Sequence, residues 1–400
     1  MTVAPLDRGR RFALLTALYF TQGLPFGFFQ NALPVIFRQR GYPIALISLG
    51  ALLALPWAFK FLIAPLVDRY GARRDWLLPL QVLLIGVVTL AAGFDPIDDI
   101  GVVLGVVLVS NLVSAVQDVP SDGLAVDLLQ PDERGVGNGL QVAAYRAGMI
   151  VGGGALLVVY GFIGWGPTLL LLAALLVGAT GVVATLAPRA RAHKPDPAPY
   201  ASMWAFVRRP GIGPWLGLLA AYKAGESFGV SVVRSFLVDR GLGIEAIGLV
   251  LGVGGFAAGL VGALVGGLVA GRVGARRALI GFAGLQAVAV ASYAVPAGGL
   301  GGVGAVVVAA LFEHFASGTA TAAVFTAMMD ASSKKTAATD YTVQACVVVL
   351  STILAGAASG ASAKALGYPA HFLFAAALCL VVVALAGGVR VPRLAAVNLA

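Results

Sequence analysis

Long apolar stretches recur along almost the whole chain, and this feature constrains the fold more than any other. Of the 400 residues, 59% are hydrophobic and only 11% are charged, against a usual charged share of about 25% in soluble domains. A membrane-spanning helix needs about 20 apolar residues, so this length leaves room for roughly a dozen spans and no large soluble domain. The stretches are continuous rather than alternating, which disfavours a β-barrel pore. We therefore predict an all-α membrane protein.

Breaks between the apolar stretches predict twelve spans. The expected spans are 12–37, 44–67, 76–93, 100–124, 138–160, 167–187, 212–237, 245–270, 278–296, 302–325, 338–366 and 370–389. The first lacks the short apolar core and small-residue cleavage site of a signal peptide, so we expect a retained helix. One long linker, rich in proline and basic residues, lies in the middle of the chain. It separates an N-terminal six-helix bundle (1–188) from a C-terminal one (211–400), with 189–210 as the cytoplasmic linker.

The placement of charge predicts the orientation in the membrane. Basic residues precede the first span, follow the second and fill the linker: Arg8, Arg10, Arg11, Arg69, Arg73, Arg74, Arg189, Arg191, Lys194, Arg208 and Arg209. Basic clusters in alternate loops follow the positive-inside rule. The acidic loop FDPIDDI (94–100) falls on the opposite side. We therefore expect both termini and the linker in the cytoplasm, and we attribute the net charge of +9 to topology rather than to a nucleic-acid partner.

Several familiar motifs are absent or misplaced. There is no Walker loop, so ATP is not the direct driver. The stretch GVGGFA (252–257) imitates a dinucleotide fingerprint, but it lies inside a span with no strand before it. Gly255 and Gly259 are better explained as helix contacts. Cys346 and Cys379 lie in apolar spans, which disfavours a disulfide framework or a zinc site.

These exclusions favour a transporter over an enzyme. Glu313 and His314 lack the HExxH spacing of a zinc hydrolase. An intramembrane enzyme and a receptor without transport remain as alternatives from other classes. We expect no cofactor and no metal, and we expect a monomer in the lipid bilayer whose partners are a small solute and H⁺.

The two halves of the chain repeat. At one constant offset and without a gap, Tyr19 aligns with Tyr222, Arg69 with Arg272, and Gly71-Ala72-Arg73-Arg74 with Gly274-Ala275-Arg276-Arg277. Repeats of whole helix bundles are typical of secondary transporters, whose substrate site lies between the halves near the midplane. Each half has an even number of expected spans, so the two repeats point the same way through the membrane.

The stretch after the second expected span resembles the loop motif of the major facilitator superfamily, Gly-x-x-x-Asp-Arg-x-Gly-x-Arg-Arg. The matches in the first half are Asp68, Arg69, Gly71, Arg73 and Arg74, with Ala64 in place of the first glycine. The matches in the second half are Gly267, Arg272, Gly274, Arg276 and Arg277, with Gly271 in place of the aspartate. The resemblance implies a major facilitator fold of two six-helix bundles with pseudo-two-fold symmetry.

A narrower resemblance concerns the solute. The stretches FTQGLPFG (20–27), LPWAFKFLIAPLVDRYG (55–71), AVQDVPSDGLAVDLL (115–129), ERGVGNGLQVAAYRAGMIVGGG (133–154) and AATDYTVQAC (337–346) are similar to the AmpG-type permease and acetyl-CoA transporter clade. The resemblance implies an inner-membrane permease, and we expect proton-coupled uptake of a bulky polar anionic solute such as an anhydro-muropeptide. The chain has no room for the two additional helices of longer muropeptide permeases, which makes an iron-siderophore importer the alternative. An acetyl-CoA-type transporter is a further one.

Charges inside the expected spans mark the candidate site, because a charge at a helix centre costs about 2.5 to 3.5 kcal/mol. Lys60 lies about 12 Å into its span from Asp68, so we favour function or buried pairing over extension to the cytoplasmic edge. Asp118 and Asp122 are one turn apart. They can carry a proton, pair with Lys60 or Arg146, or do both.

Other spans offer further polar positions. Arg146 can bind an anionic solute or serve as an ion-pair partner. Lys223 and Glu226 are expected to pair across one turn, whereas Glu313 and His314 suit either a protonation relay or a structural hydrogen bond.

Three groups of candidates follow. The substrate-binding candidates are Gln22, Lys60, Gln117, Gln141, Tyr145, Arg146, Lys223 and Gln344. The proton-coupling candidates are Asp118, Asp122, Glu226, Glu313 and His314. The gating candidates are Asp68, Arg69, Gly71, Arg73, Arg74, Arg272, Arg276, Arg277 and Asp340. We expect the loop after the second span to pair with the ends of the fourth and eleventh spans when the cytoplasmic side is closed. Asp340 either caps its helix or pairs with Arg73 and Arg74.

Overall fold

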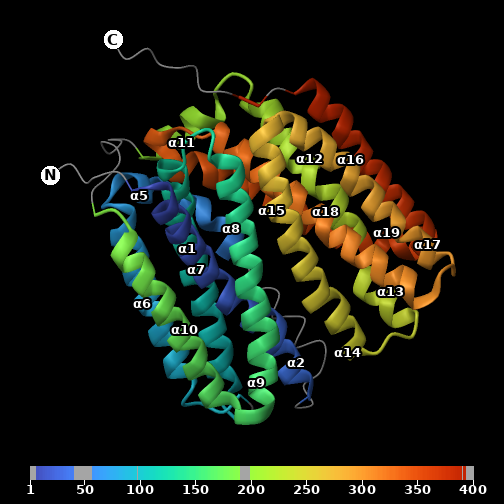
Figure 1. Cartoon of the computed structure of the whole chain (residues 1–400), viewed down its shortest axis with the longest axis horizontal. Coiled ribbons are helices and arrows are strands. Elements are labelled where there is room, and N and C mark those ends of the chain that lie inside the picture. The colour runs from blue at the N-terminus through green and yellow to red at the C-terminus, as the bar shows by residue number, and fades with distance from the viewer. Residues whose placement is uncertain (1–5, 40–55, 97, 190–198, 390, 393–400) are drawn as a thin grey trace. The chain divides into compact units, whose positions relative to one another are not determined.

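A computed structural model describes residues 6–39, 56–96, 98–189, 199–389 and 391–392 (Figure 1). These residues form helices and loops, with no strand among them. Contacts between Cα atoms divide the chain into two compact units. Unit 1 comprises Met1–Leu129, Ala144–Ser202 and Lys334–Thr342, and unit 2 comprises Gln130–Ala143, Met203–Ser333 and Val343–Ala400. Each unit therefore includes a short segment from the opposite half of the sequence.

Unit 1 is built from the helices of the first half. They are α1 (Arg8–Gly27), the π-helix η1 (Phe28–Ala32), α2 (Leu33–Gln39), α4 (Pro56–Phe59), the 3-10 helix η3 (Lys60–Leu62), α5 (Ala64–Arg69), α6 (Arg73–Ala91), α7 (Ile100–Leu128), the π-helix η4 (Val151–Ala155), α9 (Leu156–Ile163) and α10 (Trp165–Leu186). The short 3-10 helix η6 (Lys334–Thr336) also lies in this unit.

Unit 2 contains the helices of the second half. They are α12 (Ile212–Val230), α13 (Val233–Asp239), α14 (Ile244–Ile247), the π-helix η5 (Gly248–Gly254), α15 (Gly255–Val273), α16 (Ala275–Ser292), α17 (Ala294–Ala297) and α18 (Gly302–Asp330). Three helices have residues in both units: α8 (Arg134–Ile150), α11 (Pro199–Val207) and α19 (Ala337–Gly388).

Within the described residues, nine helices are long and apolar enough to cross a membrane. They are Arg8–Phe37, Arg73–Ala91, Ile100–Leu128, Arg134–Ile163, Trp165–Leu186, Gly248–Val273, Ala275–Ala297, Gly302–Asp330 and Lys334–Gly388. The last range, Lys334–Gly388, covers two expected spans, 338–366 and 370–389. Gly367, a non-helical residue with a φ of 74°, lies between them and interrupts α19. The expected second span, 44–67, lies partly outside the described residues. Helix α12, at the position of the expected seventh span, is not among the nine.

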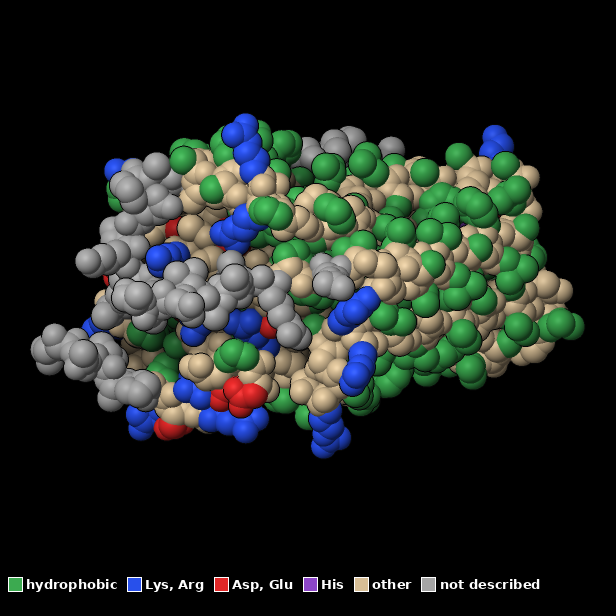
Figure 2. Space-filling model, turned by 90° about the horizontal axis from the view of Figure 1, so that it is seen from above, with side chains coloured by type: hydrophobic (Ala, Val, Ile, Leu, Met, Phe, Trp, Pro, Cys, Tyr) green, Lys and Arg blue, Asp and Glu red, His purple; other side chains and the backbone are tan. Residues whose placement is uncertain are grey.

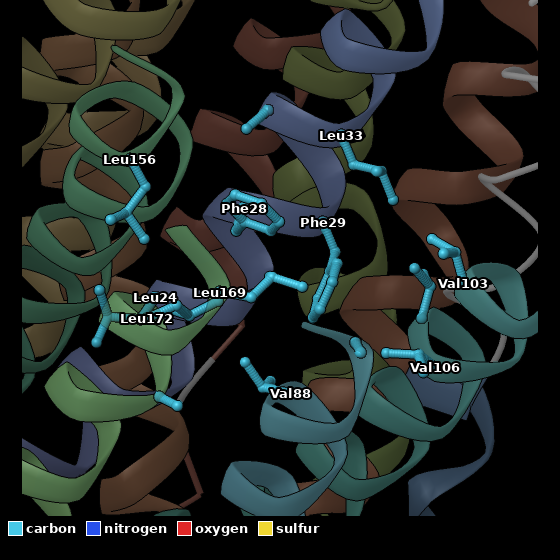
Figure 3. Packing of buried hydrophobic residues seen from close by; sticks show 14 of the residues in the cluster. Leu24, Phe28, Phe29, Leu33, Val88, Val103, Val106, Leu156, Leu169 and Leu172 are labelled. Carbon is cyan, nitrogen blue, oxygen red and sulfur yellow. The ribbon is translucent and has the colours of Figure 1, made fainter. Parts of the chain in front are cut away.

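A cluster of aliphatic and aromatic side chains forms the core of unit 1 (Figure 3). Phe28 and Phe29, from the π-helix η1, contact each other edge to face with ring centroids 5.5 Å apart. The Phe28 ring also lies 6.0 Å from that of Trp165, whose Nε1 donates to the carbonyl of Ala91 at 3.0 Å. This buried indole therefore joins the end of α6 to the start of α10 without leaving its polar atom unpaired.

Glycines let α1 approach the C-terminal part of α8 and η4 at backbone contact. A Cβ on Gly23 would lie 2.1 Å from the carbonyl oxygen of Tyr145, and one on Gly152 would lie 2.0 Å from that of Leu24. Gly148 makes a similarly close approach to Phe20. Gly148 and Gly152 therefore serve close helix packing, because a larger side chain would separate the helices.

The same principle joins α15 to α18 in unit 2. A Cβ on Gly262 would lie 2.1 Å from the carbonyl oxygen of Phe315, and one on Gly318 would lie 2.1 Å from that of Gly259. Gly255 faces the ring of His314 at a Cβ distance of 2.6 Å. Gly255 and Gly259 thus serve helix contact, as the sequence predicts, because a larger side chain would separate the two helices.

The surface combines charged and apolar regions. Figure 2 shows Lys and Arg side chains gathered with several Asp and Glu side chains on one part of the visible face, while hydrophobic side chains cover another. Large apolar residues are well exposed on several long helices, including Leu90 at 61% on α6, Val308 at 67% on α18 and Leu354 at 63% on α19. Exposed apolar side chains of this kind are expected where lipid, rather than water, surrounds a helix.

Candidate functional site

Lys60 is the centre of a buried polar cluster in unit 1, which also contains Asp118, Asp122 and Tyr19; we call it the Lys60 cluster. The ammonium group of Lys60 forms an ion pair with Asp118, and its Nζ lies 3.9 Å from Oδ2 of Asp122. Only 5% of Lys60, 8% of Asp118 and 3% of Asp122 is exposed. Two buried carboxylates therefore share one ammonium group. The prediction of buried pairing is confirmed, and extension of Lys60 to the cytoplasmic edge is excluded.

The local backbone explains how Lys60 reaches this position. The preceding residue, Phe59, has φ −104° and ψ 1°, which ends α4 and starts the tighter 3-10 turn η3. Trp57, one turn earlier, places its ring 5.5 Å from Nζ of Lys60. The lysine is thus held between an aromatic face and the two carboxylates of α7.

Hydrogen bonds from α1 complete the Lys60 cluster. The hydroxyl of Tyr19 donates to Oδ1 of Asp122 at 2.8 Å, and Nε2 of Gln22 donates to Oγ of Ser121 at 2.9 Å. Ser121 in turn donates to the carbonyl of Gln117 one turn earlier on α7. Gln22, a predicted substrate-binding residue, therefore uses one of its amide hydrogens to hold α1 against α7.

A small pocket adjoins the cluster at Trp57. It is lined by Pro25, Phe26, Phe29, Trp57, Ser110, Asn111 and Ser114. Four buried polar atoms on this part of α7 have no hydrogen-bond partner among the residues that the structure describes: both amide atoms of Gln117, Nδ2 of Asn111 and Oγ of Ser110. A buried amide without a partner is costly, so these atoms have hydrogen-bonding capacity that the described residues do not use.

Tyr145, Arg146 and Gln141 lie on α8. The ring of Tyr145 lies 5.7 Å from that of Phe26, which places this tyrosine beside the pocket. Arg146 is half-buried, and Gln141 is buried with 4% of its surface exposed. Tyr145 and Arg146 belong to unit 1, whereas Gln141 belongs to unit 2.

Lys223 and Glu226 form a second buried cluster, in unit 2, together with Ser317 and Thr321; we call it the Lys223 cluster. Lys223 pairs with Glu226, as their three-residue spacing predicts. Oγ of Ser317 donates to Oε1 of Glu226 at 2.7 Å, and Nζ of Lys223 lies 3.3 Å from Oγ1 of Thr321. The pair therefore joins α12 to α18 through both of its charges.

Glu313 and His314 lie one turn away from this cluster on α18. Nδ1 of His314 lies 3.1 Å from Oε2 of Glu313 and 2.9 Å from the carbonyl of Ala310. Nε2 of Gln286, on α16, donates to Oε1 of Glu313 at 3.1 Å. The geometry suits both predicted roles of His314, because the same nitrogen can hold a structural hydrogen bond or exchange a proton with the carboxylate.

Gln344 has a different environment from the one its predicted role in substrate binding implies. Its Oε1 accepts from Nε1 of Trp215 at 2.7 Å, and its Nε2 donates to the carbonyl of Met328 and to Oγ of Ser332. The residue is fully buried. Its amide group therefore ties α12, α18 and α19 together, which is a packing role.

A network of charges joins the ends of α5, α6 and α7 and forms what we call the loop latch: Asp68, Arg73 and Asp127. Nη2 of Arg73 donates to Asp68 at 2.6 Å, and its Nε donates to Asp127, at the end of α7, at 3.2 Å. Asp68 also accepts from the backbone N–H of Thr339 at 2.8 Å and from its hydroxyl at 2.6 Å. A carboxylate at the N-terminus of α19 is favoured by the unpaired N–H groups and the helix dipole there. The loop therefore contacts a charge at the end of the fourth expected span, Asp127, and an N–H and a hydroxyl group at the start of the eleventh. That these contacts belong to a state closed on the cytoplasmic side stays a prediction.

The other gating candidates of unit 1 have separate contacts. Nη2 of Arg74 donates to the carbonyl of Ala184 at 2.7 Å, and the guanidinium of Arg69 lies over the ring of Tyr70. Gly71 has a φ of 64°, a conformation that favours glycine and turns the chain from α5 into α6. Asp340 accepts from the hydroxyl of Thr336 at 2.9 Å within its own segment.

The arginine side chains of the second copy of the loop motif are exposed. Arg272, Arg276 and Arg277 are all exposed, and Arg276 donates to a backbone carbonyl of α19. A nearby ion pair in unit 2 was not predicted: Nη1 of Arg134 lies 2.7 Å from Oδ1 of Asp330. Helical spacing could not reveal it, because its two members are far apart in the sequence.

The sequence reasoning also missed part of the polar face of α7. Ser110 and Asn111 continue the stripe of Ser114, Gln117 and Ser121 at helical spacing, and this periodicity could have found them.

No group of three or more potential metal ligands occurs among the residues that the structure describes.

Comparison with known proteins agrees with this architecture. The family model of the Major Facilitator Superfamily matches residues 15–347. The anhydromuropeptide permease of Escherichia coli K12 is 32% identical over 384 residues, which cover 92% of this chain and 77% of that protein. These matches are transporters and permeases rather than enzymes.

Solved structures show the same fold at low sequence identity. The human organic anion transporter MFSD10 (TETRAN) superimposes with a TM-score of 0.74 and 17% identity over 95% of this chain and 100% of the other. The transporter FucP in its outward conformation gives a TM-score of 0.71 with 14% identity over 95% of this chain and 98% of the other. With its all-helical fold, its apolar helices and the family match over most of its length, the chain belongs to the Major Facilitator Superfamily and is a multi-pass membrane transporter similar to AmpG-type permeases.

Proposed function

We propose that this protein is a secondary-active inner-membrane permease that takes up an anhydro-muropeptide or a similar bulky polar anionic solute together with protons. The observation that carries the proposal is the 32% identity to an anhydromuropeptide permease over 92% of the chain. In this proposal twelve spans form two six-helix halves, residues 1–188 and 211–400, with both termini in the cytoplasm. The halves rock against each other in alternating access.

The Lys60 cluster supports proton coupling. Asp118 and Asp122 both approach the single ammonium group of Lys60. Burying charge in a membrane costs several kcal/mol, and two carboxylates around one ammonium group are proposed to exchange a proton during transport. A proton moving down the membrane potential supplies about 2.3 kcal/mol per 100 mV. Glu226, Glu313 and His314 are proposed to contribute a second protonation site in unit 2.

Polar and basic side chains support an anionic, hydrogen-bonding solute. Neither amide atom of Gln117 has a hydrogen-bond partner among the described residues, and Gln117 lies one turn along α7 from Ser114, which lines the pocket. Tyr145 lies next to this pocket through Phe26. Arg146 and Lys223 are proposed to attract carboxylate groups of the solute, because guanidinium and ammonium groups are the natural partners of carboxylates. Gln22, Lys60 and Gln141 remain proposed contributors to the binding region.

The loop latch is proposed to stabilise the state in which the cytoplasmic side is closed. Asp68 binds Arg73 and the start of α19 at the same time, so separating these elements requires breaking several charge-assisted hydrogen bonds. Arg69, Arg74, Arg272, Arg276, Arg277 and Asp340 are proposed to modulate the same step.

Uptake into proteoliposomes under an imposed pH gradient tests the proposal. We expect labelled anhydro-muropeptide to accumulate when the lumen is alkaline, and we expect Asp118→Asn and Glu313→Gln to abolish accumulation driven by the gradient. Asp132→Asn is the matched control, because Asp132 is an exposed loop carboxylate. Accumulation that persists after the gradient is collapsed would remove proton coupling from the proposal.

A parallel measurement with a ferric siderophore distinguishes the alternative solute. Accumulation of the siderophore without accumulation of the muropeptide would replace the proposed solute but leave the transport mechanism intact.

A further inference from the structure

Helix α11 is the one described element of the central linker, and its two faces differ sharply. Phe206 is fully buried, whereas Trp204 is 58% exposed and Tyr200 is 45% exposed. Tyr200 and Trp204 are one turn apart and therefore share a face. At nine residues the helix is about 14 Å long, too short to cross a bilayer.

A hydrogen bond ties the start of α11 to the segment that follows Lys60. The hydroxyl of Tyr200 donates to the carbonyl of Leu62 at 3.2 Å. In a regular α-helix the N–H of Leu66 would donate to the carbonyl of Leu62. Here the chain changes from a 3-10 helix to an α-helix, and the N–H of Leu66 donates to the carbonyl of Ile63 instead, so the carbonyl of Leu62 can accept from Tyr200. Leu62 is itself 48% exposed and apolar. The exposed face of α11 therefore begins beside apolar surface that suits lipid.

Positive charge lies at the end of the same helix. Arg208 is exposed, and its guanidinium lies 6.0 Å from the ring of Trp204. Arg209 lies over the buried Phe206 at 5.1 Å. The linker sequence from 187 to 211 contains five Lys or Arg residues and one acidic residue, Asp196. Tyr and Trp favour the membrane–water boundary, and clustered basic residues at that depth attract anionic lipid headgroups.

We propose that the exposed face of α11, formed by Tyr200, Trp204 and Arg208, is a binding surface for anionic phospholipid headgroups. The aromatic rings lie at the level of the glycerol and upper acyl region, and Arg208 pairs with the phosphate of the headgroup. A phosphate group accepts the guanidinium in a fork-like geometry, and the aromatic face beneath it lowers local water content. Lipid binding at this surface does not depend on which solute the protein carries.

A fluorescent reporter on α11 tests the surface. Ala201→Cys is labelled with an environment-sensitive dye, since Ala201 is exposed and both native cysteines are buried. The full-length protein is reconstituted into phosphatidylcholine vesicles with increasing amounts of phosphatidylglycerol. We expect a blue shift that saturates with phosphatidylglycerol and weakens at high salt. Arg208→Ala is expected to raise the phosphatidylglycerol fraction needed for half the shift about fivefold.

Two controls make the result decisive. Arg277→Ala removes an exposed arginine elsewhere and is expected to leave the titration unchanged. Inorganic phosphate, added to vesicles of pure phosphatidylcholine, reports binding of a free anion. A shift of equal size in the presence and absence of phosphatidylglycerol would overturn the proposal, and so would a shift that inorganic phosphate reproduces or that Arg208→Ala leaves unaltered.

Discussion

Removing the shared ammonium group of the Lys60 cluster should destabilise the protein through its two carboxylates. Lys60→Met keeps much of the side-chain volume but leaves Asp118 and Asp122 without the cation that both approach. At an effective dielectric constant of about 20, a unit charge 3.9 Å away, the distance from Nζ to Asp122, contributes about 4 kcal/mol. Breaking a buried pair by removing one partner costs about 3 to 5 kcal/mol. We therefore expect a loss of about 4 kcal/mol in the free energy of unfolding.

Reversible unfolding in mixed micelles measures this loss, and a double variant shows where it comes from. Lys60→Met with Asp118→Asn removes the charge of both partners, so we expect the double variant to recover at least half of the lost free energy. Lys60→Met with Asp127→Asn is the matched control, because Asp127 pairs with Arg73 and not with Lys60. If Lys60→Met were as stable as the parent, or if both double variants recovered stability equally, the electrostatic reasoning would be refuted.

Two further changes test the packing of α1 and the loop latch. Gly152→Ala should cost about 1 to 3 kcal/mol in the free energy of unfolding, because its Cβ would lie 2.0 Å from the carbonyl oxygen of Leu24; Gly154→Ala, with no atom within 4 Å, should be neutral, and equal effects would contradict the close approach. Asp68→Asn should cost about 1.5 to 3 kcal/mol per weakened hydrogen bond and speed amide hydrogen exchange at the start of α19; exchange no faster than in Asp132→Asn would argue against the latch.

Local spacing predicted those contacts of the candidate site that lie within one helix. Lys223 and Glu226 pair across one turn because a three-residue spacing places them on the same helix face. The cost of a charge in the membrane predicted that Lys60 would be paired, and Asp118 was among the partners considered. Helical geometry and the energetic cost of a buried charge are sufficient for both predictions, and both can be applied to a sequence alone.

Contacts between helices were harder to predict, because they depend on how far one helix is shifted along its neighbour. Periodicity gives the polar face of a helix but not its height relative to the next one. The hydrogen bond from Gln286 to Glu313 and the Arg134–Asp330 pair both join separate helices and escaped prediction. Gln344 was assigned to substrate binding because it is a polar residue in a span, whereas its amide group is occupied by neighbouring helices.

The two copies of the loop motif show that a repeat can keep its backbone positions while its chemistry diverges. In the first copy Asp68 has 2% of its side chain exposed and binds Arg73, so charge holds the elements together. The second copy has Gly271 in place of the aspartate, and a Cβ there would have its nearest neighbour at 3.9 Å, so packing does not forbid a side chain. A Cβ on Gly135, by contrast, would lie 2.4 Å from the nitrogen of Gly271. Close backbone approach therefore replaces the ion pair in the second copy. If opening of the permease breaks the Asp68–Arg73 pair and the Gly135–Gly271 contact, we expect the sensitivity of opening to salt and to charge substitutions to come mainly from the Asp68–Arg73 pair.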